Sequence, residues 1–412
     1  MSAQPLEQPA GVAEVVATLV SPEGRADPYP WYEVIRSYGN IVQVKNDVMF
    51  AVGYEECSRA LRENQLRVQD GEAYDSIYPD WREHSSLRGY IDSMLYTNEP
   101  DHARLRRLVS KGFTPARVAA LRPSVERMTD RLLDRLEDEF GDGSTLDFIA
   151  EFAARLPIAV ISALLGVPEE DQAWFRRMAE DQAIALEGIS GSALAIGDAA
   201  MDQLSEYFLG IVDHHRKHPG DDTVSGLVQV HDTGQERLST DELVGNMMLL
   251  LTAGFETTSF LLGHALLLAL QNPWHAARLR DEPDFAAGYV EEVLRFESPV
   301  QATSRWAATD VEVLGHTVAA GTKLVVVLGA GNRDPRRYSH PERFDPTRTD
   351  VQPLSFGAGG HFCLGAPLSR MEAQIAMPRL LRRFPRIARA GEHARRDRWI
   401  ARGLSELPIT LT

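Results

Sequence analysis

The sequence places one of its two cysteines in a short segment that could hold a negative charge. In FGAGGHFCLG, residues 356–365, glycines precede Cys363 and Gly365 follows it, and a helical pattern begins at Ala366. At the start of a helix, free backbone N–H groups and the positive end of the helix dipole favour an anion. We therefore expect this environment to hold Cys363 as a thiolate. The flanking glycines would let a flat, bulky group lie against the backbone.

Two interpretations of Cys363 follow from these residues. Cysteine is among the most buried residue types, and a lone cysteine is usually a small apolar residue of the core. A thiolate in a glycine-rich loop, with room for a flat partner, instead suggests an axial ligand to haem iron. The other cysteine, Cys57, lies in a helical pattern without ligand spacing, and we interpret it as structural.

Two further segments carry groups that could do chemistry. Pro100 and Asp101 predict a helix start, after which His102 and Arg106 are four residues apart and share a face. The opposite face carries a basic stripe, which in most helices is simply solvated: Arg104, Arg107 and Lys111. In the longest apolar pattern, residues 238–273, the string AGFETT places a carboxylate and hydroxyls among leucines. The hydroxyl of Thr257 could simply bond a carbonyl one turn back, and this alternative stays open.

The elements that position these groups are mostly helices. We expect a β-hairpin over residues 41–54, helix over 55–64, mostly helix over 116–240, and helices over 238–273, 285–299 and 366–384. Residues 70–98 lose periodicity and carry scattered aromatic side chains, which predicts either a lid over an apolar pocket or a surface excursion packed on itself.

The pattern F-x-x-G-x-x-x-C-x-G over Phe356–Gly365 strongly resembles the haem-binding signature of the cytochromes P450. Further motifs of that family occur upstream in the same order, namely H-x-x-x-R at 102–106, A-G-x-E-T at 253–257 and E-x-x-R at 292–295. The resemblance runs from about residue 25 to the end and is closest to soluble actinobacterial members that oxidise macrolides and related natural products. It implies a mainly α fold with small β-sheets and a long central helix over a buried haem. It also implies a single domain over residues 1–412, with residues 1–24 as an extended lead-in.

The resemblance also implies a role for each matched residue. Cys363 would be the axial ligand, Thr257 would hydrogen-bond oxygen at the iron, and Glu256 would relay protons. The residues expected to contact the haem are His102, Arg106, Ala253, Gly254, Arg305, Phe356, Gly357, His361, Cys363 and Gly365. A structural triad would join Glu292 and Arg295 to Arg343, with Arg348 as the alternative. The expected substrate pocket contains Met94, Leu95, Leu249, Thr252, Ala253, Val300, Ala302 and Leu404.

The implied activity is that of a haem-thiolate monooxygenase using haem b and O₂, with electrons from NAD(P)H. The chain has no spare cysteines for an iron–sulfur cluster, so the electrons would come from a separate ferredoxin and ferredoxin reductase. The substrate would be a bulky, mostly apolar small molecule, hydroxylated or epoxidised in secondary-metabolite biosynthesis. Alternatives are a peroxide-driven enzyme, another oxidation such as desaturation or coupling, a haem sensor, or a P450-like scaffold. Retention of Cys363 and of Glu256–Thr257 speaks against the last two.

Composition limits the partners and the compartment. A net charge of −16 argues against nucleic acid as the main partner. Two cysteines in 412 residues fit a reducing cytoplasm, and the N-terminal residues show neither a basic region followed by an apolar core nor a membrane anchor. Despite the acidic total, the basic stripe at 104–111, with Arg382 and Arg383, would form a docking face for an acidic electron donor. We expect a monomer.

Overall fold

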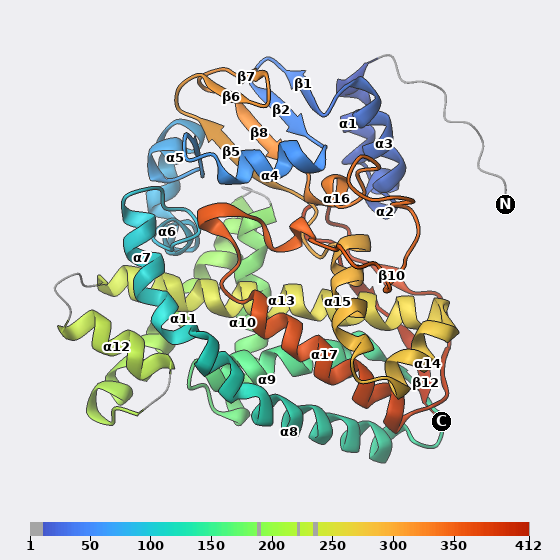
Figure 1. Cartoon of the computed structure of the whole chain (residues 1–412). Coiled ribbons are helices and arrows are strands. Elements are labelled where there is room, and N and C mark those ends of the chain that lie inside the picture. Colours follow the sequence, from blue (N-terminus) through green and yellow to red (C-terminus); the bar gives the residue numbers. More distant parts are fainter. Residues whose placement is uncertain (1–10, 188–190, 221–222, 234–237, 412) are drawn as a thin grey trace. The chain divides into compact units, whose positions relative to one another are not determined.

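A computed structural model describes residues 11–187, 191–220, 223–233 and 238–411 (Figure 1). Most of the chain is helical, as the sequence predicts. The α-helices are α1 (Val12–Leu19), α2 (Pro22–Ala26), α3 (Tyr29–Tyr38), α4 (Tyr54–Arg62), α5 (Gly71–Ile77), α6 (Ser85–Ile91), α7 (Asp101–Ser110), α8 (Pro115–Phe140), α9 (Arg155–Leu164), α10 (Gln172–Glu187), α11 (Gly191–Lys217), α12 (Thr223–Thr233), α13 (Thr240–Gln271), α14 (Pro273–Asp281), α15 (Phe285–Phe296), α16 (Leu328–Gly331) and α17 (Ala366–Arg383).

The strands are short, and single turns of 3₁₀- or π-helix join several elements. The strands are β1 (Ile41–Lys45), β2 (Val48–Ala51), β3 (Leu66–Arg67), β4 (Thr145–Asp147), β5 (Thr303–Ala307), β6 (Val311–Val313), β7 (His316–Val318), β8 (Lys323–Val326), β9 (Ile387–Arg389), β10 (Ala394–Arg395), β11 (Leu404–Glu406) and β12 (Pro408–Leu411). The turns are η1 (Pro79–Glu83), η2 (Lys111–Phe113), η3 (Ile149–Ala153), η4 (Glu169–Asp171), η5 (Leu354–Phe356) and η6 (Gly359–His361).

The chain divides into two compact units, each built from separate stretches of sequence. Unit 1 comprises Met1–Arg67, Glu291–Phe362 and Arg395–Arg402, and unit 2 comprises Val68–Val290, Cys363–Ala394 and Gly403–Thr412. The expectation of one domain over the whole chain stays a prediction. We describe each unit by itself.

Unit 1 is organised around a five-stranded sheet of order β1-β2-β8-β5-β3. The predicted hairpin is confirmed, since β1 pairs with β2 antiparallel around the turn at Asn46–Asp47, while β2 and β8 run parallel. Alternate strand residues enter two hydrophobic clusters, one of which also receives apolar residues of α1 and α3. The expected extended lead-in is therefore wrong from residue 12, because α1 buries Val15 and Leu19 in this cluster.

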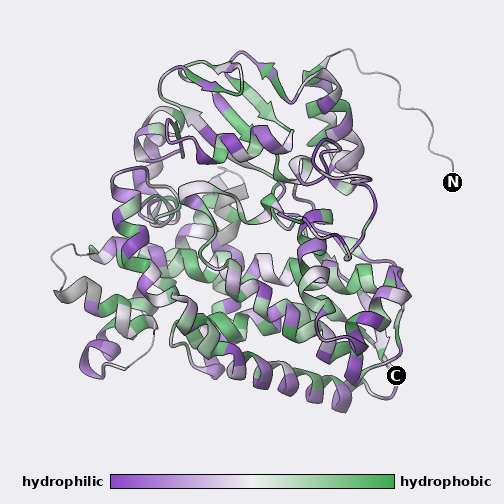
Figure 2. Ribbon diagram, in the orientation of Figure 1, coloured by the Kyte–Doolittle hydropathy of each residue, from purple (hydrophilic) through white to green (hydrophobic). Residues whose placement is uncertain are grey.

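Unit 2 is a helical assembly with α13 as its most buried helix. A capping box starts α13, because Ser239 accepts from the Glu242 N–H and Glu242 accepts from the Ser239 N–H. Hydrophobic residues follow most of its length (Figure 2), and α6, α9 and α17 pack against it. The helix is long and apolar enough to cross a membrane, but 72% of its apolar window is buried inside the protein. It is therefore a core helix, as predicted.

Most of residues 70–98 differ from the expected irregular loop, whereas residues 92–98 are irregular as expected. The first part forms α5, η1 and α6, which are too short to show a clear helical period in the sequence. Their ends are fixed by side chains: Asp70 accepts from the Ala73 N–H at 3.2 Å, and Asp198 of α11 accepts from the Ser86 N–H at 2.9 Å. The segment is consequently anchored to the helices of unit 2.

Candidate active site

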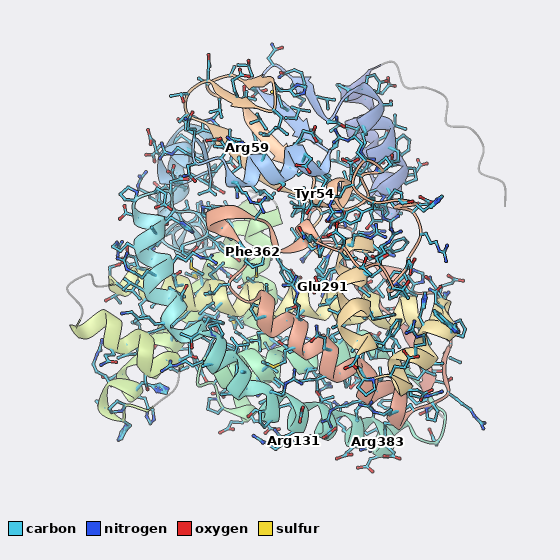
Figure 3. The ribbon with its side chains drawn as sticks, viewed as in Figure 1. Tyr54, Arg59, Arg131, Glu291, Phe362 and Arg383 are labelled. Carbon is cyan, nitrogen blue, oxygen red and sulfur yellow. The ribbon has the colours of Figure 1, made fainter. Side chains whose placement is uncertain are left out.

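The predicted glycine loop before Cys363 is confirmed. Within unit 1, Gly357 and Gly359 adopt φ values of 70° and 71°, a region that favours glycine. A Cβ at Gly359 would lie 2.5 Å from the Leu61 carbonyl oxygen, so α4 approaches the loop at a distance that only glycine permits. Phe362, the last residue of the second stretch of unit 1, projects from this loop in Figure 3. Gly365 then caps α17, whose first residue is Ala366 as expected.

The electrostatics of Cys363 correct one prediction. Its thiol is accessible, yet burial is the main influence on it and raises its pKa above the usual value. Backbone N–H groups of Gly365 and Ala366, and the guanidiniums of Arg106 and Arg370, act in the opposite direction without reversing the shift. The prediction that the chain alone holds a thiolate is therefore wrong. A metal cation would supply what is missing, because a coordinating thiol is deprotonated outright.

The helix α7 presents His102 and Arg106 inward, as their spacing predicts. His102 is buried, and its Nδ1 lies 3.3 Å from Oε1 of Glu99. Arg106 is half-buried, and burial lowers its pKa while the Cys363 sulfur acts to raise it. The structure therefore brings this arginine and the predicted ligand cysteine together within unit 2. Such a partly desolvated cation beside the thiol is suited to an anionic group of a bound cofactor.

Arg305 in unit 1 shows independently whether the residues present are suited to a haem. Its side chain is 5% exposed and donates one hydrogen bond, to the Ser304 carbonyl at 2.8 Å. Burial lowers its pKa to about 10, and among the described residues no carboxylate forms an ion pair with it. Buried guanidiniums normally have an anionic partner. The predicted haem propionate would be such a partner, so Arg305 fits the group that the sequence implies.

The helix α13 is partly accessible to solvent at the predicted A-G-x-E-T motif. Ala253 is exposed and Gly254, Glu256 and Thr257 are partly buried, whereas the residues on either side are buried. The Thr257 hydroxyl donates to the Ala253 carbonyl at 2.8 Å, which is the local bond left open as an alternative. This bond does not exclude the oxygen-side role, which stays a prediction. The accessible patch is nevertheless where a ligand could meet a hydroxyl and a carboxylate.

Gly254 lies where α9 packs against α13, and its expected contact with the haem stays a prediction. A Cβ there would lie 3.2 Å from Cδ1 of Ile161, so the glycine accommodates α9 against α13. The helix continues unbroken through this position. A link that the motifs did not reveal lies one residue beyond Thr257, where the hydroxyl of Thr258 donates to Ser369 of α17 at 3.1 Å. This bond joins α17, the helix that begins after Cys363, to α13. In the sequence, only the spacing from Cys363 to Ser369 indicates such a contact.

The E-x-x-R pair is buried, and the expected third member is wrong. Arg295 and Glu292 have completely buried side chains joined at 2.7 Å and 2.8 Å. Arg348, which was the alternative, supplies the third charge, with its Nε 3.3 Å from Glu292. Arg343 is exposed and contributes its backbone carbonyl, which accepts from Arg295 at 3.0 Å. The cluster is therefore structural, as the resemblance implies, but it joins Glu292, Arg295 and Arg348.

The expected substrate pocket is only partly compatible with the structure. Leu404 is fully buried beside Gly263 of α13 and does not occupy a hairpin tip. Ala302 is also buried, in the same cluster as α1 and α3. Both predictions are wrong, because position along the chain does not reveal which way a side chain points. The remaining expected residues range from buried to exposed: Met94, Leu95, Leu249, Thr252, Ala253 and Val300.

The expected basic docking face is partly neutralised. Arg104 is bonded to Glu242 of α13, and Arg383 contacts Asp134 at 2.8 Å and Glu137 at 2.6 Å where α17 ends beside α8 (Figure 3). Arg107 and Lys111 are exposed. The predicted docking face for an electron donor therefore rests mainly on Arg107 and Lys111.

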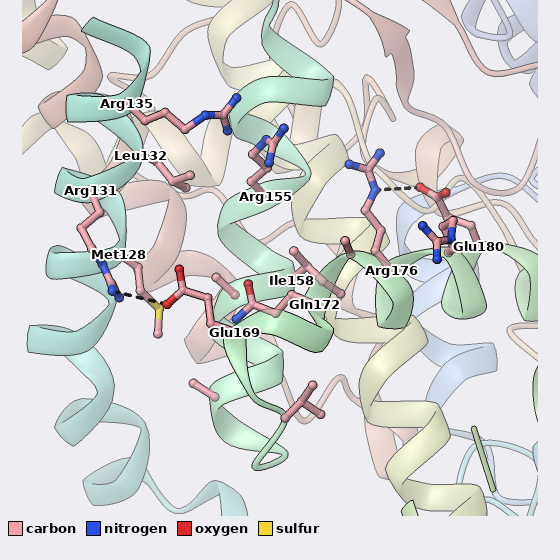
Figure 4. Close-up of a pocket in the computed structure, with 15 residues that line it drawn as sticks. Met128, Arg131, Leu132, Arg135, Arg155, Ile158, Glu169, Gln172, Arg176 and Glu180 are labelled. Atoms are coloured by element: carbon pink, nitrogen blue, oxygen red, sulfur yellow. Dashed lines mark hydrogen bonds and ion pairs between the residues drawn. The ribbon is translucent and has the colours of Figure 1, made fainter. Parts of the chain in front are cut away.

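Unit 2 also has a cleft of about 790 Å³ among α8, α9 and α10 (Figure 4). Its rim pairs Arg131 with Glu169 at 3.7 Å and Arg176 with Glu180 at 3.1 Å. None of the predicted site residues lines it. The cleft combines ion pairs at its rim with apolar residues at its base. It is distinct from the group of residues around Cys363.

Comparisons with known proteins match nearly the whole chain. The family profile described as Cytochrome P450 matches residues 36–391. 6-Deoxyerythronolide B hydroxylase of Saccharopolyspora erythraea is 35% identical, covering 96% of this chain and 99% of that protein. The polyketide biosynthesis cytochrome P450 PksS of Bacillus subtilis is 38% identical, covering 87% of this chain and 88% of that protein.

Solved structures agree with these matches. The crystal structure of P450BioI, in complex with an acyl carrier protein ligated to hexadec-9Z-enoic acid, has a TM-score of 0.87 and 33% identity. It covers 95% of this chain and 99% of that one. The mainly α architecture with small sheets is therefore shared with solved structures of full length.

Proposed function

Because the chain belongs to the cytochrome P450 family and is a haem-dependent monooxygenase, we propose that it oxidises a bulky, mostly apolar small molecule in secondary-metabolite biosynthesis. The observation that carries the proposal is the accessible Cys363 thiol with Arg106 beside it, at the start of a helix packed on α13. The hydroxylase of 6-deoxyerythronolide B and the polyketide enzyme PksS support a polyketide or macrolide as the substrate class.

The residues that would hold the haem are those that the family motifs match. Cys363 would ligate the iron, His102, Arg106 and Arg305 would receive the propionates, and the loop from Phe356 would lie along the ring. When bound, haem supplies the activation of O₂ by electrons delivered one at a time. The protein's own residues do the rest: apolar side chains exclude water, and the accessible hydroxyl and carboxylate on α13 hold and pass protons.

We further propose a cytoplasmic, monomeric enzyme that receives electrons from NAD(P)H through a ferredoxin and its reductase. The exposed Arg107 and Lys111 suit an acidic donor. Peroxide as oxidant, and desaturation or coupling as reaction, are the alternatives within the same site. Glu256 and Thr257 favour the O₂-dependent route, because a peroxide-driven reaction does not require a proton relay.

The experiment is to measure product formed per O₂ consumed, with ferredoxin, reductase and NADPH, after a substrate has been found by the haem spin shift. Thr257→Val keeps the side-chain volume and removes the hydroxyl, so we expect haem and substrate binding to persist while product per O₂ falls several-fold. Thr257→Ser restores a hydroxyl and is expected to recover most of the coupling. Unchanged coupling in Thr257→Val would refute the relay role.

A further inference from the structure

Three helices of unit 2 contribute side chains to a buried polar cluster that no family motif includes. Tyr90 of α6 donates its hydroxyl to Oε1 of Gln182 on α10 at 2.8 Å. Thr252 of α13 donates its hydroxyl to the same oxygen at 2.7 Å. All of these side chains are buried, and Gln182 is 0% exposed. The carboxamide of Gln182 is therefore fixed from two sides.

The other end of this carboxamide is its amide nitrogen, Nε2. Among the described residues, Nε2 of Gln182 has no hydrogen-bond partner, although the atom is buried. Nearly all buried side-chain donors in proteins are paired, because an unpaired one forfeits its bonds with water. The donor is thus held in place by bonds to Oε1 while its own N–H bonds remain unused. This arrangement is what a site awaiting an acceptor atom would show.

The cluster lies next to the accessible part of α13. Thr252 directly precedes the exposed Ala253, and the charge of Glu256, one turn further on, adds to burial in raising the pKa of Tyr90. The donor therefore belongs to the same region as the residues that would face the substrate. Nε2 is covered in this structure, so a ligand would reach it only with a shift of α6 or α10, a rearrangement of the kind that a substantial minority of complexes show on binding.

We propose that Gln182 is a specificity-determining residue, and that its amide N–H binds a carbonyl oxygen of the substrate. This inference rests on the proposed function and narrows it to molecules that combine a bulky apolar body with at least one carbonyl group. A site with a buried donor rejects an analogue lacking the acceptor more strongly than an apolar wall distinguishes two hydrocarbons. A preference of roughly 10- to 100-fold is expected for one such bond.

The test compares ketones with hydrocarbons of the same ring size. Cyclopentadecanone and cyclopentadecane, with cyclododecanone and cyclododecane as a second pair, are titrated into the holoenzyme, and dissociation constants are obtained from the haem spectrum. We expect the wild type to prefer at least one ketone by roughly 10- to 100-fold. Gln182→Met keeps the volume and removes the donor, together with the oxygen that accepts from Tyr90 and Thr252, so the preference for the ketone over its matched hydrocarbon should fall below about threefold.

Two variants control the experiment. Gln203→Met changes an exposed glutamine of α11 whose amide bonds the Ala199 carbonyl at 3.0 Å, and it should retain the wild-type preference. Thr252→Val keeps the amide but removes one of the bonds that orient it, and it should retain an intermediate preference. It also provides the test should Gln182→Met not retain haem.

A wild-type holoenzyme with no ketone preference, including one that binds no ketone, would overturn the proposal. Retention of the full preference in Gln182→Met, or in Thr252→Val when that variant serves as the test, would also overturn it. These results are distinguishable from failure of the proposed function, which would appear earlier as a wild-type protein without the haem-thiolate spectrum.

Discussion

The buried cluster around Arg295 offers a quantitative test of the corrected triad. Arg295→Met removes a completely buried guanidinium that makes two bonds to Glu292 and donates to the carbonyls of Asn332, Pro341 and Arg343 at 3.1, 2.9 and 3.0 Å. Removing one partner of a buried ion pair costs about 3–5 kcal/mol, because the remaining charge stays desolvated. Glu292 retains Arg348 at 3.3 Å and the Asp345 N–H at 2.8 Å, which limits the loss. We expect the free energy of unfolding to fall by about 4 kcal/mol.

The two neighbouring arginines provide matched comparisons. Arg348→Met removes a mostly buried partner of Glu292 and two bonds to carbonyls at 2.7 Å, so we expect a loss of about 1–3 kcal/mol. Arg343→Ala keeps the backbone carbonyl that Arg295 uses and removes only an exposed side chain, so it should cost less than about 0.5 kcal/mol.

The assay is urea unfolding of each holoenzyme, followed by far-ultraviolet circular dichroism and by the haem absorbance. The two signals report separately on the helices and on the cofactor. If Arg343→Ala costs as much as Arg295→Met, or if Arg295→Met unfolds within about 1 kcal/mol of the wild type, the assignment of the triad is refuted.

Two further predictions concern the predicted haem site. Arg305→Met removes a buried cation that has no carboxylate partner in the part of the chain that the structure describes, so apoprotein stability should be unchanged or higher. Haem transfer from the variant to apomyoglobin should be roughly tenfold faster than from the wild type, and equal transfer rates would contradict the propionate role. Gly359→Ala would force a residue at φ 71° and place a Cβ 2.5 Å from the Leu61 carbonyl, so urea unfolding should show a loss of at least about 1–2 kcal/mol. Gly365→Ala is the matched comparison, since its Cβ would lie 3.9 Å from the Cys363 sulfur, an ordinary contact, and a larger loss there than at Gly359 would contradict the account.

The elements that position the site can be predicted from local sequence, because each element carries its own cap, turn or apolar pattern. Ser239 and Glu242 cap α13, its apolar residues run nearly all round, and the turn at Asn46–Asp47 defines the hairpin. The helices α5 and α6 have no such signal. They depend on bonds such as that from the Ser86 N–H to Asp198, which lies more than a hundred residues away in the sequence.

The side-chain surroundings could not be predicted in the same way. Arg343 and Arg348 lie in an irregular segment, and spacing along such a segment does not reveal that one guanidinium points to Glu292 and the other to solvent. The raised pKa of Cys363 has a similar origin. Helix-start N–H groups are visible in the sequence, whereas the burial that outweighs them arises only from packing.

The central claim is that Cys363 binds haem iron as a thiolate, although the surrounding chain alone raises the pKa of the thiol. The most direct measurement is the absorption spectrum of the purified protein after reduction and addition of carbon monoxide. Our account predicts the red-shifted band of thiolate ligation in the wild type and its loss in Cys363→His. A wild-type protein that binds no haem, or one that shows the spectrum of histidine ligation, would contradict it.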